Sequence, residues 1–142
     1  MTRIDFYILQ SGSPGAGNAV ACRLTEKAYQ LGHKVYIHTA DADQTEALDE
    51  LLWTFRAGSF VPHRRCDAGD DFAPVLIGHG EAPEIRPDVL INLSGEVPLF
   101  FSRFERVAEV VEGEEPQRAG ARERFRFYRE RGYELATHEL EG

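Results

Sequence analysis

The segment IDFYIL, residues 4–9, decides the fold, because its nearly continuous run of branched and aromatic side chains predicts a strand covered on both faces. Such strands lie at the centre of parallel sheets, where helices cover each face. The turn-forming stretch SGSPGAG, residues 11–17, follows directly. The segment therefore predicts the first central strand of an α/β protein.

Outward from this strand, the chain alternates strand-like and helix-like segments. We expect strands at residues 34–39, 74–77, 88–93 and 106–111, helices at 18–31, 43–55 and 116–131, and a helical turn within 98–104. Asn18 is expected to cap the first helix, and Asp43 with Glu46 to form a capping box for the second. This order predicts a three-layer α/β sandwich with a mainly parallel central sheet, formed by residues 1–142 as a single domain.

A phosphate-binding loop would lie between the first strand and the first helix, where Gly12, Gly15 and Gly17 occur. The stretch lacks the Gly-Lys-Ser/Thr ending of a Walker loop, and GAGNAV contains only the first half of the dinucleotide fingerprint. We interpret the glycines as turn residues. The topology is expected to resemble that of mononucleotide-binding proteins without a functional phosphate loop.

Composition excludes several classes of protein. A formal net charge of −8 argues against a general nucleic-acid coat, which needs a surplus of Lys and Arg. No apolar run approaches the roughly 18 residues of a membrane span, and the first ten residues lack a signal-peptide cleavage site. Cys22 and Cys66 have no CxxC spacing, so we expect reduced thiols and a cytoplasmic location.

The polar residues give no basis for catalysis. The histidines are scattered without metal-ligand spacing: His33, His38, His63, His79 and His138. Ser94 is not in a G-x-S-x-G elbow, and no acid and histidine pair with it in the sequence. We therefore expect no enzyme activity, cofactor or metal.

Two stretches are candidates for binding. In LLWTFRAGSFVPH, residues 51–63, a helix that carries the chain's only tryptophan runs into an apolar loop, which indicates either a core plug or a partner-binding patch. Near the C-terminus, six arginines lie within fourteen positions, at 118, 122, 124, 126, 129 and 131. Arg118 and Arg122 are four residues apart and Phe125 follows three later, so a helix places all three on one face.

Five ordered pieces of sequence resemble one family. They are DFYIL, the W-x-x-x-x-G-S-F-V-P-H segment from Trp53 to His63, PVLIG, PDVLINL and ARERFRFYRERGY. Over nearly its whole length the chain resembles the chi subunits of the bacterial DNA polymerase III holoenzyme. The resemblance implies an accessory component of the clamp-loader assembly, with an α/β fold and no known catalytic activity.

The resemblance also implies two binding surfaces. One binds the psi subunit in a 1:1 heterodimer that links to the clamp loader, and a repair helicase is a further candidate partner there. It maps onto Trp53, Phe60, Val61, Pro62 and His63. We expect Phe60 and Val61 to be the exposed contacts, and Leu52 and Phe55 to be internal; Trp53 packing only into its own core remains the alternative.

The second implied surface binds the acidic C-terminal tail of single-stranded-DNA-binding protein and maps onto Arg118, Arg122, Phe125 and Arg126. A guanidinium there would grip the terminal carboxylate while an aromatic ring packs in an apolar notch. Aromatic residues interleave with these arginines, so direct binding of single-stranded nucleic acid is an alternative. A nucleotide-dependent enzyme is the third possible function.

Overall fold

The computed structural model describes residues 2–10, 15–55, 61–65, 73–80, 88–114 and 116–140. In chain order the elements are β1 (Arg3–Leu9), α1 (Ala16–Gln30), β2 (Val35–His38), α2 (Ala42–Thr54), β3 (His63–Arg65), β4 (Val75–Gly78), β5 (Val89–Asn92), the 3-10 turn η2 (Phe101–Arg103), β6 (Arg106–Val111), α3 (Gln117–Glu130) and β7 (Glu134–Leu140). Every helix and strand expected from the sequence is present, and η2 lies within the expected helical turn.

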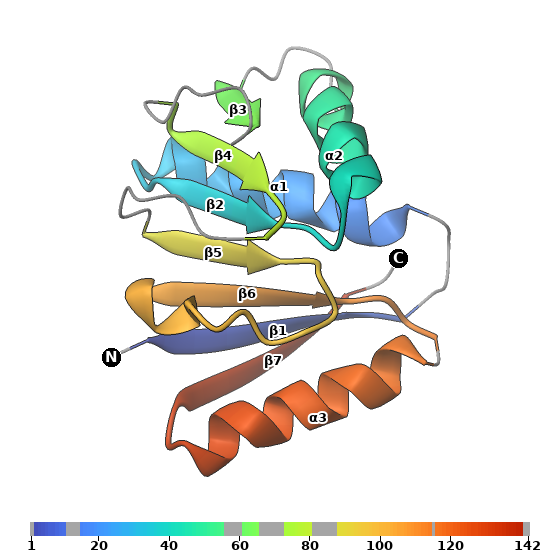
Figure 1. Ribbon diagram of the computed structural model, residues 1–142, viewed down its shortest axis with the longest axis vertical. Helices are drawn as coiled ribbons and strands as arrows, with labels where there is room; N and C mark the ends of the chain where they lie inside the picture. The colour runs from blue at the N-terminus through green and yellow to red at the C-terminus, as the bar shows by residue number, and fades with distance from the viewer. Residues whose placement is uncertain are drawn as a thin grey trace.

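The strands form one sheet in the order β3-β4-β2-β5-β6-β1-β7, and all pairs among the described residues are parallel (Figure 1). The IDFYIL segment lies in β1, which pairs with β6 on one side and with β7 on the other. Because β1 is hydrogen-bonded along both edges, its side chains face the two layers that cover the sheet. The predicted mainly parallel sheet is confirmed.

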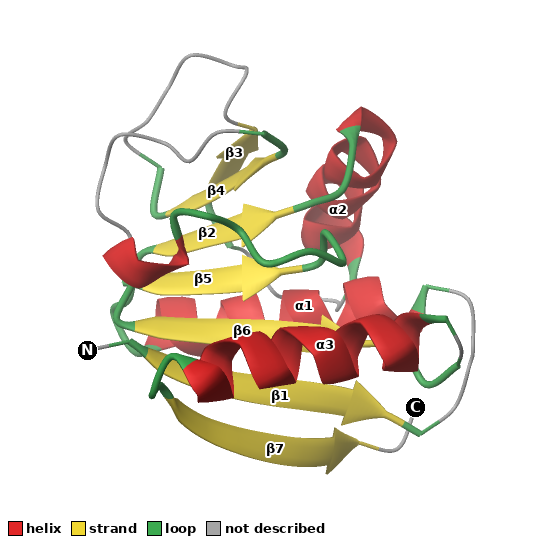
Figure 2. Cartoon of the chain, turned by 60° about the horizontal axis from the view of Figure 1, so that its bottom comes forward, coloured by secondary structure: helices red, strands yellow, loops and turns green. Residues whose placement is uncertain are grey.

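Helices lie on both faces of the sheet: α1 and α2 on one, α3 on the other (Figures 1 and 2). Alternate residues of each strand fill two apolar layers. On the α1 and α2 face the buried side chains include Leu9, Val35, Ile37, Ile77, Val20 and Leu48. On the α3 face they include Ile4, Phe6, Tyr36, Leu90, Ala121 and Tyr128. The predicted three-layer sandwich is confirmed.

The helix starts differ from the predicted caps. Helix α1 begins at Ala16, directly after Gly15, whose φ of 79° places the chain in the left-handed region that glycine tolerates best. Asn18 therefore lies inside the first turn, and its predicted capping role is wrong. Helix α2 is capped by Asp41, whose side chain accepts a hydrogen bond from Gln44 N at 2.8 Å. The predicted cap at Asp43 is two residues too late: Asp41 is the extended residue before the helix, at φ −161°, and Asp43 lies in the first turn.

The sequence did not predict two strands, β3 and β7. The seven residues of β7, ELATHEL, are all exposed or half-buried. Within the described sheet, β7 pairs only with β1. An edge strand with this many polar residues lacks the continuous apolar run that identifies a central strand.

A buried carboxylate joins the edge of the sheet. Asp5 of β1 contacts Arg106 of β6 and His138 of β7, each at 3.1 Å, and Arg3 at 3.6 Å. Burial raises the pKa of Asp5, but the hydrogen bonds from His138 and Arg106 and the two guanidinium charges outweigh it, so the pKa is lowered. The ionised form of Asp5 is therefore favoured in the folded protein.

Asp5 should make stability depend on acid pH. With a folded pKa below its usual 3.8, the carboxylate stabilises the fold above that pH, and the contribution is lost as pH falls through the folded pKa. We expect Asp5→Asn to lower the free energy of unfolding at pH 7 and 5, and the difference from wild type to shrink below pH 3.8. Urea unfolding at several pH values measures this. A difference that grows as the pH falls would contradict it.

The remaining expectations concern the two cysteines and membrane-spanning segments. Cys22 is a buried free thiol, and burial raises its pKa to about 12, so it stays protonated. Cys66 lies outside the described residues. No helix in the described part of the chain is long and apolar enough to cross a membrane.

Candidate functional site

Gly15 and Gly17 lie at the start of α1. A Cβ atom at Gly17 would lie 2.8 Å from Oε1 of Glu112, so a larger residue there would have to displace the end of this side chain. Gly15 supplies the left-handed conformation that begins the helix. Gly15 thus has the turn role expected of it, while Gly12 lies outside the described residues.

The described histidines make separate local contacts. His33 lies 3.4 Å from Asp88, and His138 lies 3.1 Å from Asp5. Nδ1 of His79 is 3.1 Å from the Thr45 hydroxyl. Within the part of the chain that the structure describes, no three His, Cys, Asp or Glu side chains group as metal ligands.

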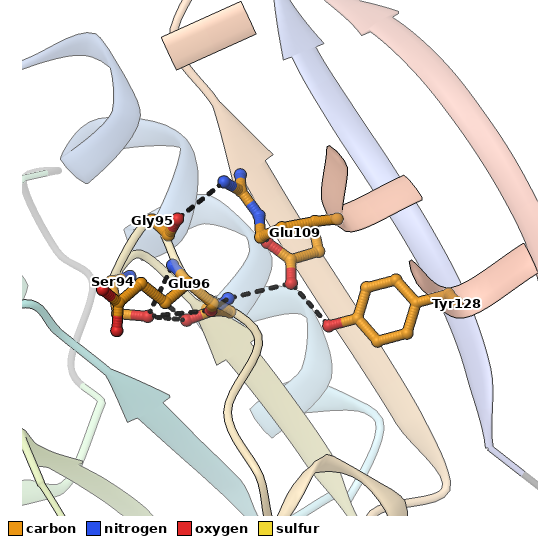
Figure 3. Close-up of polar contacts among 7 residues, drawn as sticks. Ser94, Gly95, Glu96, Glu109 and Tyr128 are labelled. Atoms are coloured by element: carbon orange, nitrogen blue, oxygen red, sulfur yellow. Dashed lines mark hydrogen bonds and ion pairs between the residues drawn. The ribbon is translucent and has the colours of Figure 1, made fainter. Parts of the chain in front are cut away.

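A polar network surrounds Glu109 of β6 inside the protein (Figure 3). Arg124 of α3 donates from Nε to Glu109 Oε1 at 3.0 Å, while Asn92 and Tyr128 donate to Oε2 at 2.8 and 2.7 Å. The Arg124 guanidinium also donates to the carbonyl of Gly95 at 2.9 Å. The network therefore fixes α3 to β5, β6 and the segment after β5.

Electrostatics make this network costly to break. Glu109 is fully buried and the side chain of Arg124 is only 9% exposed. Burial raises the pKa of Glu109, and the charge of Arg124 with the hydrogen bonds from Asn92 and Tyr128 opposes that rise. Burial and the neighbouring Glu109 raise the pKa of Tyr128, so its hydroxyl remains a donor. Arg124, one of the six clustered arginines, thus points inward and not to solvent.

A groove of about 140 Å³ runs along α3 and is called the α3 groove below. Its lining comes from β1, β6, β7 and α3: Phe6, Ile8, Val111, Thr137, Arg118, Ala121, Arg122 and Phe125. Register explains the floor, since Phe6 lies opposite Thr137 and Ile8 lies opposite Val111. The structure therefore brings an apolar floor under two arginines of one helix face.

The predicted residues of α3 occupy different positions around this groove. Arg118, Arg122 and Phe125 all line it, as their spacing indicated. Arg118 is half-buried and donates from Nε to the Gly113 carbonyl at 2.6 Å, whereas Arg122 is exposed at the rim. Phe125 packs on Phe6 with ring centroids 5.4 Å apart. Arg126 is exposed but does not line the groove.

The second candidate surface lies at the end of α2 and is called the Trp53 face, comprising Trp53, Pro62, Val61 and His63. Trp53 is 48% exposed, and its ring lies 4.2 Å from the ring of His63. The expectation that Val61 is exposed is wrong, because it is only 1% exposed and packs in the core. Phe60 lies outside the described residues.

His63 is also buried, and it holds the Trp53 face in place. Its Nδ1 lies 2.6 Å from the Val61 carbonyl and its Nε2 lies 2.9 Å from the Asp49 carbonyl of α2. The contact with Asp49 ties β3 to α2 beside the tryptophan ring. Leu52 is internal as expected, and Phe55 is half-buried.

Sequence reasoning missed the floor of the α3 groove. Phe6, Ile8 and Val111 were predicted only as strand residues, and Thr137 lies on β7, which was not predicted. The alternation of β1 was a usable signal, because it places Phe6 and Ile8 on one face. Nothing in the sequence showed that β7 would lie beside β1.

The fold and these sites define a parallel α/β protein with two candidate surfaces, one aromatic and one apolar with a basic rim. The family model described as DNA polymerase III chi subunit, HolC, matches residues 1–136. The chain therefore belongs to the DNA polymerase III chi subunits, a family of accessory subunits of that replicative polymerase. The resemblance seen in the sequence is confirmed.

Relatives support this membership over the whole chain. The chain is 50% identical over 140 residues to DNA polymerase III subunit chi of Pseudomonas aeruginosa, covering 99% of this chain and 98% of the relative. It is 32% identical over 143 residues to the Escherichia coli protein of the same name, covering 96% and 97%. The Haemophilus influenzae protein is 31% identical over 138 residues, covering 96% of each.

Proposed function

We propose that this chain is a non-catalytic adaptor of the bacterial cytoplasm, a single domain of residues 1–142. The Trp53 face binds the psi subunit in a 1:1 heterodimer and so joins the clamp loader. The α3 groove binds the acidic C-terminal tail of single-stranded-DNA-binding protein, so contact with DNA is indirect. Family membership supports the assignment to the polymerase complex.

The observation that carries the tail-binding role is the α3 groove itself. A peptide that ends in an aromatic residue carries an apolar ring and a free carboxylate within a few ångströms. The floor of Phe6, Ile8 and Val111 suits the ring, and the guanidinium of Arg122 at the rim suits the carboxylate. Arg118 adds positive charge, fixed by its bond to Gly113, and exposed Arg126 adds to the field over the acidic residues.

Exposure of an aromatic ring supports the role of the Trp53 face. A half-exposed tryptophan held from below by a buried histidine is a preorganised anchor, of the kind that dominates protein interfaces. In this proposal Trp53, Phe60 and Pro62 contact psi, while Val61 and His63 support them. A repair helicase is a competing candidate for the same face.

The two surfaces lie at opposite ends of the sheet. His63, beneath Trp53, belongs to β3 at one edge, and Thr137 of the α3 groove belongs to β7 at the other. Figure 1 shows α2 and α3 at the two ends of the molecule. Both partners can therefore bind at once, which an adaptor requires.

Arg122→Ala should weaken binding of the tail peptide by about 1–3 kcal/mol, because it removes a charge-assisted hydrogen bond to the carboxylate. Fluorescence anisotropy with a labelled peptide measures the loss. Arg126→Ala is the matched control: it removes an exposed arginine of the same helix that does not line the groove, so its effect should be smaller. If Arg122→Ala binds the tail peptide as tightly as wild type, the α3 groove does not bind the tail as proposed, whether or not psi binding changes.

A further inference from the structure

A second groove, of about 190 Å³, lies on the opposite face of the sheet from the α3 groove. It runs between the second half of α1 and the amino ends of β1, β5 and β6, and we call it the α1 groove. The residues that matter below are Leu24, Lys27, Ala28, Leu31, Val89 and Arg106. The first four of these, Leu24 to Leu31, follow one another along α1 at intervals of three, one and three residues, which places them on one helix face.

The walls of the α1 groove are aliphatic and only partly covered. Leu24, Ala28 and Val89 are half-buried against the core, and Leu31 at the end of the helix is 68% exposed. Leu31 is one of three large hydrophobic residues exposed among the described part of the chain. This face of α1 therefore leaves apolar surface that its own sheet does not cover.

The rim of the groove is basic. Lys27 is exposed, and its side chain forms no ion pair among the described residues. Arg106 is half-exposed and contacts the buried Asp5. Asp5 does not oppose an incoming anion, because Arg3 and His138 contact it as well. Among the described Asp, Glu, Lys and Arg residues that line the groove, Lys27 and Arg106 are basic and Asp5 alone is acidic.

Size and wall chemistry restrict the occupant. The volume is below the roughly 300–1,000 Å³ of small-molecule sites, so it suits one side chain better than a cofactor. Single-stranded nucleic acids stack their bases on exposed aromatic rings. Here Tyr7 is the one aromatic residue that lines the groove, among the described residues, and its ring is already stacked on His138 at 4.7 Å.

We propose that the α1 groove binds an acidic segment of another protein, which inserts one apolar side chain between Leu24, Leu31 and Val89. Carboxylates that flank the inserted residue meet Lys27 and Arg106. Unlike the tail proposed for the α3 groove, this segment needs no free C-terminal carboxylate. Because the sheet separates the two grooves, the sites are independent, and the α1 groove is a further docking surface of this subunit.

The test titrates the full-length, ¹⁵N-labelled protein with the peptide acetyl-Asp-Asp-Phe-Asp-Asp-amide, which has an internal aromatic residue and no terminal carboxylate. We expect saturable shifts of backbone amides in residues 24–31 and in β1 and β5. Lys27→Glu should weaken binding about fivefold or more, since it reverses a rim charge. Arg23→Glu is the matched control, because Arg23 is exposed on the same helix but does not line the groove.

Ala28→Trp, which fills the groove without changing charge, should abolish the shifts. Absence of saturable shifts in residues 24–31 would overturn the proposal, as would equal weakening by Lys27→Glu and Arg23→Glu. Equal binding of a peptide with alanine in place of phenylalanine would also overturn it, since only charge would then act. Oligothymidylate that shifts these amides where the peptide does not would assign the groove to nucleic acid. Shifts in residues 118–125 bear only on the α3 groove.

Discussion

Arg124→Ala is expected to lower the free energy of unfolding by about 3–5 kcal/mol, because it leaves the fully buried carboxylate of Glu109 without its cation. The variant also loses the hydrogen bond from Arg124 to the Gly95 carbonyl, which fixes the segment after β5. Urea unfolding followed by circular dichroism measures the loss. A cooperative transition at much lower urea, with an unchanged slope, is the expected result.

Two further variants separate the ion pair from other effects. Arg126→Ala removes an exposed arginine from the same helix and should change stability by less than about 0.5 kcal/mol. Glu109→Met combined with Arg124→Met replaces both charges by apolar side chains and should recover part of the loss. A cost below about 1 kcal/mol for Arg124→Ala would show that the buried pair does not hold α3 in place.

Trp53→Ala should weaken psi binding by about 2–4 kcal/mol, the range of a central aromatic anchor at an interface. The ring is half-exposed and lies 4.2 Å from the buried His63, so its removal deletes contact area without opening the core. Isothermal titration of purified psi measures the loss. Circular dichroism of the variant establishes that it remains folded.

Leu99→Ala is the matched control for the tryptophan. Leu99 is 91% exposed and lies in the segment between β5 and β6, away from the Trp53 face. Removing it deletes exposed apolar surface of a different region and should leave psi affinity unchanged. Equal affinity of wild type and Trp53→Ala for psi would show that the ring serves only its own fold.

Local sequence patterns predicted the central part of the fold. IDFYIL identified β1 because a strand buried on both faces must be apolar at nearly every position. The strand from Arg106 to Val111 was recognised from its valines and short length. In contrast, β7 is polar at four of its seven positions and is held by its pairing with β1, so only the tertiary structure reveals it.

The candidate site was predictable only where helix spacing determines it. Arg118, Arg122 and Phe125 share one face of α3, which the intervals of four and three residues indicate directly. The same helix turns Arg124 inward to Glu109, a partner fifteen residues earlier that no local pattern identifies. Val61 was expected to be an exposed contact, but it is only 1% exposed and packs in the core on the α1 and α2 face.

The central claim is that this subunit joins psi to the tail of single-stranded-DNA-binding protein through surfaces at opposite ends of its sheet. The most direct test titrates a labelled tail peptide, and separately a labelled oligonucleotide, into the purified complex with psi. We predict that the peptide binds the complex as tightly as it binds the free subunit, and that the oligonucleotide binds weakly. Tight oligonucleotide binding without peptide binding, or release of the peptide by psi, would contradict the account.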